Sequence, residues 1–199
     1  EGQSDALNKG FALSEGAILG WLNSDDVYYS NSLHEVATLD WDKTDFCYGK
    51  GMWISRSGQD ICTYPTFKPN KYSLYFTCTL CQPAVFFAND ARCELGDFSK
   101  EYYCAFDYEF WLRAVMKKMR FQYVPKLLAK SRMYPQNKSL AGQMTVKEES
   151  TALKGKYYHQ VNLNSIRKRF NRFLVNRLTN RQCKLLAARL QADETNILS

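Results

Sequence analysis

The side chains best suited to chemistry in this sequence are two adjacent carboxylates. Asp25 and Asp26 close the stretch GWLNSDD, in which the apolar run at 18–22 stops at Asn23 and Ser24. Adjacent like charges repel each other, and burial makes the repulsion worse. A hard divalent cation such as Mg²⁺ or Mn²⁺ prefers oxygen ligands and would cancel this repulsion. The alternative is that Asp25 caps the following turn and Asp26 is solvated, because Asp is common in turns.

A second acidic residue lies near the start of a predicted helix. Asp107 falls in the first turn of the helix expected over 107–118, in the stretch FDYEFWLR. The helix dipole stabilises a carboxylate there, so we expect the pKa of Asp107 to be lowered. Its functional interpretation is a general base, and the alternative is an Asp that only matches the dipole. We expect Trp111, on the same helix, to pack in the core.

The elements that must position these residues alternate between helices and strands, which favours an α/β fold without internal repeats. Apolar periodicity and turn signals predict helices over 4–15, 31–38, 70–80 and 107–118, and strands over 17–22, 46–48, 52–55, 61–64, 84–88, 121–124 and 127–131. Ligands of open α/β sheets bind at the carboxyl ends of strands. The acidic pair, which follows the strand at 17–22, is therefore expected at such an edge.

The charge divides the chain into two parts. Residues 1–144 carry 16 Lys or Arg and 16 Asp or Glu, whereas residues 145–199 carry 11 basic and 4 acidic residues. The excess of +7 therefore lies in the second part, which is helical and amphipathic in character. We predict a catalytic-type domain over 1–144 and a basic helical tail over 145–199.

The seven cysteines and the apolar runs indicate the cellular setting. An odd number of cysteines without a regular spacing favours reduced thiols in a cytosolic protein. Cys78 and Cys81 form a CxxC, but no second pair accompanies them, so buried thiols are favoured over a zinc or redox site. No stretch approaches the length of a membrane span, and the start does not resemble a signal peptide. We expect a cytoplasmic protein, with peripheral contact at the membrane face as an option.

The order of the motifs resembles that of the family 2 glycosyltransferases with the GT-A fold. The resemblance covers about residues 2–138. The stretches that carry it are GQSDALNKG at 2–10, GWLNSDD at 20–26, CQPAVFF at 81–87, LGDF at 95–98, AFDYEFWLR at 105–113 and SRMYPQNKS at 131–139. It implies a Rossmann-like mixed sheet for nucleotide-diphospho-sugar transfer.

The resemblance also implies roles for particular residues. Asn23-Ser24-Asp25 fills the DxD position, with Asp25 and Asn23 as metal ligands for Mn²⁺ or Mg²⁺. Asp107 resembles the base that deprotonates an acceptor hydroxyl in an inverting displacement. The residues that correspond to positions near the donor or acceptor are Gln3, Ser4, Asp5, Asn8, Asp26, Gln82, Pro83 and Arg113.

The sequence departs from the family pattern at several positions. Asn23 replaces the first Asp of the DxD motif, Leu7 stands where many relatives carry Arg, and Tyr134 stands where many carry His. The family domain normally starts about 90 residues earlier, and without those strands the sheet would expose a hydrophobic edge. We therefore expect either a part of a longer transferase, which binds nucleotide-sugar poorly on its own, or a chain whose missing elements are supplied from elsewhere.

The implied activity is a hexosyltransferase-like step in polysaccharide or glycoconjugate biosynthesis. Its partners would be a nucleotide-sugar donor and a saccharide or lipid-linked acceptor. One alternative is a non-catalytic homologue. Another is a polyanion- or membrane-binding module that uses the basic tail at 145–199. Nucleic acid is a disfavoured partner, because no nucleic-acid-binding motif is present and residues 1–144 are neutral.

Overall fold

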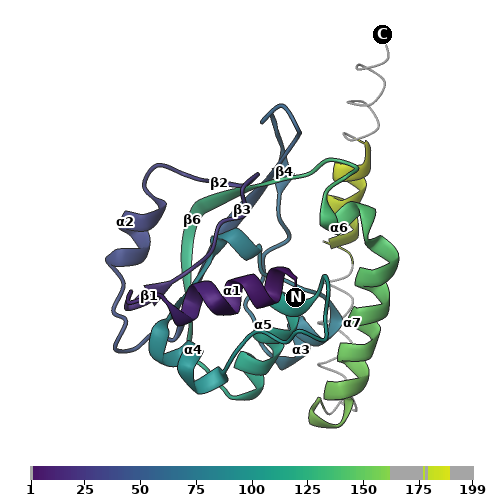
Figure 1. Ribbon diagram of the computed structural model, residues 1–199. Coiled ribbons are helices and arrows are strands. Elements are labelled where there is room, and N and C mark those ends of the chain that lie inside the picture. Colours follow the sequence, from purple (N-terminus) through teal and green to yellow (C-terminus); the bar gives the residue numbers. More distant parts are fainter. Residues whose placement is uncertain (1, 162–176, 178, 189–199) are drawn as a thin grey trace.

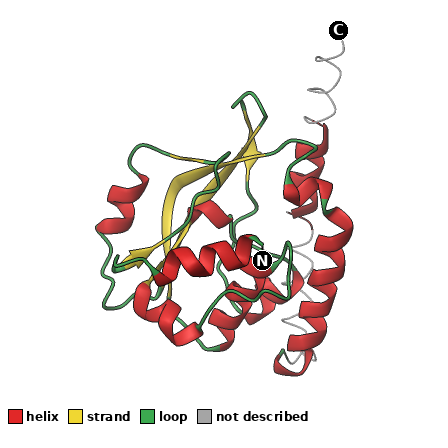
Figure 2. Ribbon diagram, in the orientation of Figure 1, coloured by secondary structure: helices red, strands yellow, loops and turns green. Residues whose placement is uncertain are grey.

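A computed structural model describes residues 2–161, 177 and 179–188 of the protein. A curled, mixed six-stranded sheet lies at its centre, and helices surround it (Figures 1 and 2). The strands are β1 (Ile18–Leu19), β2 (Val27–Tyr28), β3 (Phe46–Ile54), β4 (Asp60–Thr63), β5 (Val85–Ala88) and β6 (Phe121–Arg132). The expected mixed α/β class is confirmed.

The long strand β3 organises the sheet. The order along the sheet is β1-β5-β3-β6-β2, and β4 pairs with the second half of β3. β3 and β6 are parallel, whereas the other pairs are antiparallel. The turn between β1 and β2 therefore lies at the end of β6, because β2 pairs Val27 with Lys130.

Two strands that the sequence predicts in pieces are continuous. β6 includes Pro125, which cannot donate a ladder hydrogen bond, and the register with β3 shifts in this region. β3 includes Gly51, where a Cβ atom would lie 2.2 Å from Sγ of Cys81. The absent side chain lets the loop before β5 approach the sheet closely.

The helices before residue 162 are α1 (Gln3–Ala12), α2 (Ser32–Ala37), α3 (Lys71–Phe76), α4 (Asn89–Leu95), α5 (Phe106–Met116), α6 (Lys138–Ala141) and α7 (Gln143–Tyr157), with short 3₁₀ turns η1 (Gln82–Ala84) and η2 (Tyr158–Gln160). Residues 179–188 are also helical. The predicted helices correspond to α1, α2, α3 and α5, within a few residues at their ends, except that α3 is shorter than 70–80. α4, α6 and β2 were not predicted from the sequence.

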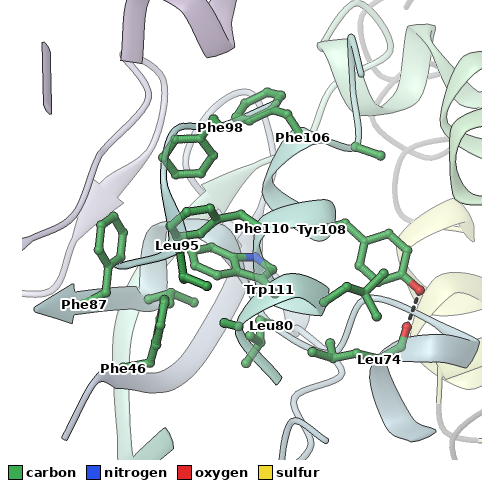
Figure 3. Close-up of a cluster of buried hydrophobic side chains, with 14 of the residues drawn as sticks. Phe46, Leu74, Leu80, Phe87, Leu95, Phe98, Phe106, Tyr108, Phe110 and Trp111 are labelled. Atoms are coloured by element: carbon green, nitrogen blue, oxygen red, sulfur yellow. Dashed lines mark hydrogen bonds between the residues drawn. The ribbon is translucent and has the colours of Figure 1, made fainter. Parts of the chain in front are cut away.

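The main core lies between one face of the sheet and helices α1, α4 and α5. Alternate strand residues point to it, so Phe46 and Phe87 face this core while Cys47 and Phe86 face a second cluster on the side of α2. Trp111 is fully buried, which confirms its expected packing role, and it lies beside Phe46 and Phe110 (Figure 3).

The start of the basic tail packs on this core. Leu153 and Tyr157 of α7 belong to the main cluster, and Leu153 is fully buried. Further along, Leu186 packs against Trp53 and Met133. Most of the basic and apolar residues that define the predicted amphipathic segment, at 162–176, lie outside the described residues. Within the described ranges, no helix is long and apolar enough to cross a membrane.

Candidate functional site

The acidic pair lies in the turn between β1 and β2. Asp26 is buried, and its two carboxylate oxygens accept hydrogen bonds from the backbone N–H of Arg132 (2.9 Å) and from Nδ2 of Asn23 (3.1 Å). Burial raises the pKa of Asp26 above its ordinary value. The register of β2 with β6 brings Asp26 to the last residue of β6. Asp26 is therefore fixed by the sheet itself.

Asp25 is more accessible than Asp26. One of its carboxylate oxygens accepts a hydrogen bond from the Tyr134 hydroxyl at 3.0 Å, and Nε of Arg132 donates to its backbone carbonyl at 2.9 Å. The charge of Asp25 and this hydrogen bond raise the pKa of Tyr134. Tyr134, which replaces the His of many relatives, thus contacts the predicted metal ligand directly.

A series of amide hydrogen bonds joins the acidic turn to neighbouring elements. Nε2 of Gln3 donates to Oδ1 of Asn23 (2.9 Å), and Nδ2 of Asn23 also donates to Oε1 of Gln82 (2.9 Å). Nε2 of Gln82 donates to the Trp21 carbonyl (2.8 Å), and Nζ of Lys138 donates to Oε1 of Gln3 (3.1 Å). Three predicted site residues, from α1, the turn and η1, are thus brought together.

Asp107 lies in the first turn of α5, as predicted, but its electrostatics differ from the prediction. The backbone N–H of Tyr108 donates to it at 2.6 Å, which lowers its pKa. Burial has the larger effect and raises the pKa of Asp107 to about 6. The expected lowering by the helix dipole is therefore wrong in direction, because the loss of hydration outweighs the dipole. A carboxyl that titrates near neutrality suits a general base.

Asp107 and the acidic turn share neighbouring residues, whose pKa values or contacts they both affect. Burial first, and then the charges of Asp26 and Asp107, raise the pKa of the Cys81 thiol. The ammonium group of Lys138 lowers the pKa of Asp107 and also contacts Gln3. Lys138 lies over the rings of Tyr103 and Phe106, at 4.1 and 5.3 Å from their centroids. The ammonium group of Lys138 therefore lies between the start of α5 and the amides that hold the acidic turn.

The three predicted site residues further along α1 make contacts inside the protein. Ser4 and Asp5 are buried, and Asp5 forms ion pairs with Lys100 and, at 2.8 Å, with Lys9. These hydrogen bonds lower the pKa of Asp5 to about 2. Asn8 accepts from the Phe98 N–H (2.8 Å) and donates to the Phe98 carbonyl (2.9 Å). Asn8 thus holds α1 to the segment before α5.

Pro83 and Arg113 are also engaged within the fold. Pro83 is buried in η1, directly after Gln82. The guanidinium of Arg113 donates to the carbonyls of Leu95 (2.6 Å) and Asp97 (2.9 Å), and it pairs with Glu109 at 2.9 Å. These contacts tie α5 to the end of α4.

The residues at the acidic turn fit a cation that is shared with a phosphate ligand. Among the described residues, no group of three or more His, Cys, Asp or Glu side chains could hold a metal alone. Both oxygens of Asp26 and the amide oxygen of Asn23 already accept N–H groups, which leaves Asp25 as the available carboxylate. Mg²⁺ sites commonly combine one or two carboxylates with substrate phosphates. Asp25 and the oxygens of a diphosphate would together provide such a set of ligands.

Sequence reasoning missed several residues that the structure brings to this site. Lys138, Arg132 and Glu149 contact the acidic turn or the start of α5. Arg132 and Lys138 lie in the stretch SRMYPQNKS, where only Tyr134 was singled out, as a departure from the family pattern, and Glu149 carried no signal. Their positions depend on the register of β6 and on the docking of α7. Neither of these can be derived from local sequence.

The comparisons with known proteins give a consistent class at low identity. No protein-family model matches the chain. A protein of Rickettsia conorii named as an uncharacterized glycosyltransferase is 27% identical over an alignment of 153 residues that covers 69% of this chain and 24% of that protein. A protein of Rickettsia prowazekii with the same kind of name is 27% identical over an alignment of 131 residues that covers 56% of this chain and 38% of that protein. The chain thus spans less than half the length of these relatives.

The solved structures show the fold. Staphylococcus aureus TarS superposes with a TM-score of 0.57 and 16% identity, over 84% of this chain and 29% of TarS. A shorter TarS structure in complex with UDP superposes with a TM-score of 0.55 and 16% identity, over 84% of this chain and 48% of that chain. The chain has the α/β fold of this part of TarS, and its relatives by sequence are named glycosyltransferases.

Proposed function

We propose that the protein is a family 2, GT-A-type glycosyltransferase that moves a sugar from a nucleotide-diphosphate donor to an acceptor hydroxyl with inversion. The observation that carries the proposal is Asp107, a carboxyl with a pKa of about 6 on the first turn of α5, which shares its neighbours Lys138 and Cys81 with the acidic turn. The names of the sequence relatives support glycosyl transfer, and the complex of TarS with UDP supports the donor class.

In this mechanism Asp107 is the general base. The acceptor oxygen forms a bond to the anomeric carbon while the bond from that carbon to the diphosphate oxygen breaks. The proton of the hydroxyl moves to Asp107, and the electron pair of the broken bond stays on the leaving diphosphate. A base whose pKa lies near the working pH contributes about 10²–10⁴-fold in rate. This step forms no covalent intermediate with the protein.

Asp25 would hold a divalent cation together with the donor diphosphate, with Asn23 as its neighbour in the DxD position. When bound, Mn²⁺ or Mg²⁺ stabilises the negative charge of the leaving diphosphate. Asp26 orients the turn through Arg132 and Asn23, and Lys138 adds a fixed positive charge beside Gln3. The acceptor would be a saccharide or a lipid-linked sugar.

Two substitutions in the full-length protein test this proposal. Asp107→Asn keeps the size of the side chain but removes the base, so transfer should fall by at least about 100-fold while donor binding persists. Asp25→Ala should instead abolish the manganese-dependent binding of a nucleoside diphosphate, measured by calorimetry. Asp90→Asn makes the same change at an exposed residue of α4 and is the matched control, which should transfer sugar as the wild type does. Retention of substantial transfer by Asp107→Asn would exclude Asp107 as the base, whereas absence of transfer by the wild-type protein would favour a non-catalytic homologue.

A further inference from the structure

The start of α5, the helix that carries Asp107, is held by a carboxylate from α7. Glu149 accepts hydrogen bonds from the backbone N–H groups of Tyr103 (2.6 Å), Cys104 (2.9 Å) and Ala105 (2.8 Å). These are the three consecutive residues before Phe106, the first residue of α5. The N-cap residue of α5 itself, Ala105, makes no side-chain capping hydrogen bond. Three charge-assisted bonds fix the direction in which the helix begins.

α7 contacts α5 a second time, within its first turn. The Tyr157 hydroxyl donates to Glu109 at 3.1 Å, and Nζ of Lys156 lies 3.7 Å from the same carboxylate. Leu153, between these contacts and Glu149 in sequence, is fully buried in the main core. α7 is therefore tied to the start and the first turn of α5 by polar contacts, and Leu153, which lies between them in sequence, anchors α7 in the main core.

Asp107 faces charged and titratable groups from several elements. Glu149 of α7 raises its pKa, and Lys138 at the start of α6 lowers it. The thiols and the phenol that interact with it have pKa values raised by burial and are neutral at neutral pH; they are Tyr64, Cys78, Cys81 and Cys104. Glu149 thus contributes a negative charge that opposes Lys138.

We propose that Glu149 is a positioning residue for the base: it fixes the first turn of α5 and, through its charge, makes Asp107 a stronger proton acceptor. This inference rests on the proposed role of Asp107 in transfer. Neither the resemblance nor the comparisons assign a role to α7. In this arrangement α7 is part of the catalytic unit, although it lies in the predicted tail.

The test compares Glu149→Gln with Glu148→Gln. The first substitution keeps an acceptor oxygen but removes the charge, whereas the second removes an equal charge from an exposed residue of the same helix. The titration of the Asp107 carboxyl is followed by ¹³C NMR, with Asp107→Asn to identify its resonance. We expect Glu149→Gln to lower the midpoint by about 0.5 pH unit and Glu148→Gln to shift it by about 0.1 unit or less. Equal shifts, or no shift in Glu149→Gln, would overturn the proposal.

Transfer kinetics provide the second arm. In the full-length protein, the acid limb of the kcat/KM profile should move to lower pH in Glu149→Gln, as in the NMR titration. A carboxylate that only stabilised the fold would leave this midpoint unchanged. If the NMR midpoint shifts but the wild-type protein transfers no sugar, the proposed function fails and the coupling stands. If Asp107→Asn abolishes transfer but neither midpoint shifts, only the role of Glu149 fails.

Hydrogen exchange in the wild-type protein covers the case in which Glu149→Gln does not fold. The amides of Tyr103, Cys104 and Ala105 should exchange more slowly than those of an unprotected loop, because Glu149 accepts all three. Tyr103 is 65% exposed, so burial alone does not predict protection of its amide, whereas Ala105 is buried and is the less informative of the two. Exchange of these amides at unprotected rates would overturn the proposal without any variant.

Discussion

Asp107 combines a cost in stability with a gain in reactivity. Asp107 is half-buried, and the desolvation of its carboxyl raises the pKa to about 6, which keeps a large fraction of it ionised at neutral pH while it remains a good proton acceptor. A charged group in such surroundings lowers the stability of the folded protein. Asp107 should therefore lower the stability of the folded protein and, at the same time, be needed for transfer.

The stability of the protein should depend on pH through this carboxyl. The pKa of Asp107 rises from 3.8 to about 6 on folding, so the native state binds this proton more tightly than the unfolded state. This contribution to stability is complete below about pH 4 and is lost as the pH rises through 6. Asp107→Asn should therefore be more stable than wild type at pH 7, by on the order of 2 kcal/mol, and the difference should shrink toward pH 4. Urea unfolding at the two pH values measures this difference, and a difference that grows toward pH 4 would contradict the assignment.

Tyr134 should contribute to donor binding through Asp25. Tyr134→Phe removes the hydroxyl that donates to the Asp25 carboxylate, while the ring that packs near Arg56 remains. Loss of one such hydrogen bond costs about 1 kcal/mol, so manganese-dependent binding of a nucleoside diphosphate should weaken about fivefold. Calorimetry measures the affinity. Tyr103→Phe, which keeps the ring under Lys138, is the matched control and should bind as wild type does.

At the level of elements, α1 mainly holds the segment before α5 in place through Asn8 and Phe98. Asn8→Ala would leave the buried N–H and carbonyl of Phe98 without their side-chain partner. An unsatisfied buried group costs about 1–3 kcal/mol, so unfolding by urea should show a loss of about 2–4 kcal/mol. Lys9→Ala, an exposed change on the same helix, should cost about 0.5 kcal/mol or less. A loss no larger than that of the control would leave Asn8 free for another role.

The docking of α7 gives an independent prediction. Leu153→Ala should lower the free energy of unfolding by about 2–4 kcal/mol, because it removes buried methyl groups from the main core. Met144→Ala, at an exposed residue of the same helix, should have little effect. A small effect at Leu153 would mean that α7 is only loosely attached, and the proposal for Glu149 would weaken with it.

Local sequence predicted most of the elements and part of the site. Apolar runs and turn residues identified the strands and α1, α2, α3 and α5, because these signals act within a few residues. The short strand β2 was not predicted, because its formation depends on pairing with Ala129 and Lys130. The shift in register near Pro125 and the direction in which the pKa of Asp107 moves were not predicted either. Register and burial are set by residues that are distant in sequence, and local patterns do not encode them.

At the level of the whole molecule, the charge is divided between a balanced domain and a basic tail. The excess of +7 lies in residues 145–199, and the structure shows that the first of these, in α7, already belong to the folded core. A membrane role would therefore fall on the basic residues that follow α7. Removal of everything after residue 144 would test folding and membrane binding together, so substitutions are the sharper probe.

A triple substitution tests the membrane role without deleting core residues. Arg167→Gln, Lys168→Gln and Arg169→Gln together should weaken binding to anionic vesicles, because each basic residue near such a surface contributes about 1 kcal/mol. Co-sedimentation at low salt measures the binding. Lys117→Gln, Lys118→Gln and Lys126→Gln remove the same charge from the balanced domain and should have a smaller effect. An equal loss in both triple variants would indicate that only net charge matters.

The amides around the acidic turn form a one-way chain of donors. Lys138 can only donate and the Trp21 carbonyl can only accept, so the orientations of Gln3, Asn23 and Gln82 between them are fixed at both ends. Bonds that point in one direction polarise one another. A carboxylate in place of any of these amides would have the right shape and no N–H to pass on, and at Gln82 it would face the Trp21 carbonyl with like partial charge. The polarity of the chain, more than the volume of its members, thus restricts which residues can occupy these three positions.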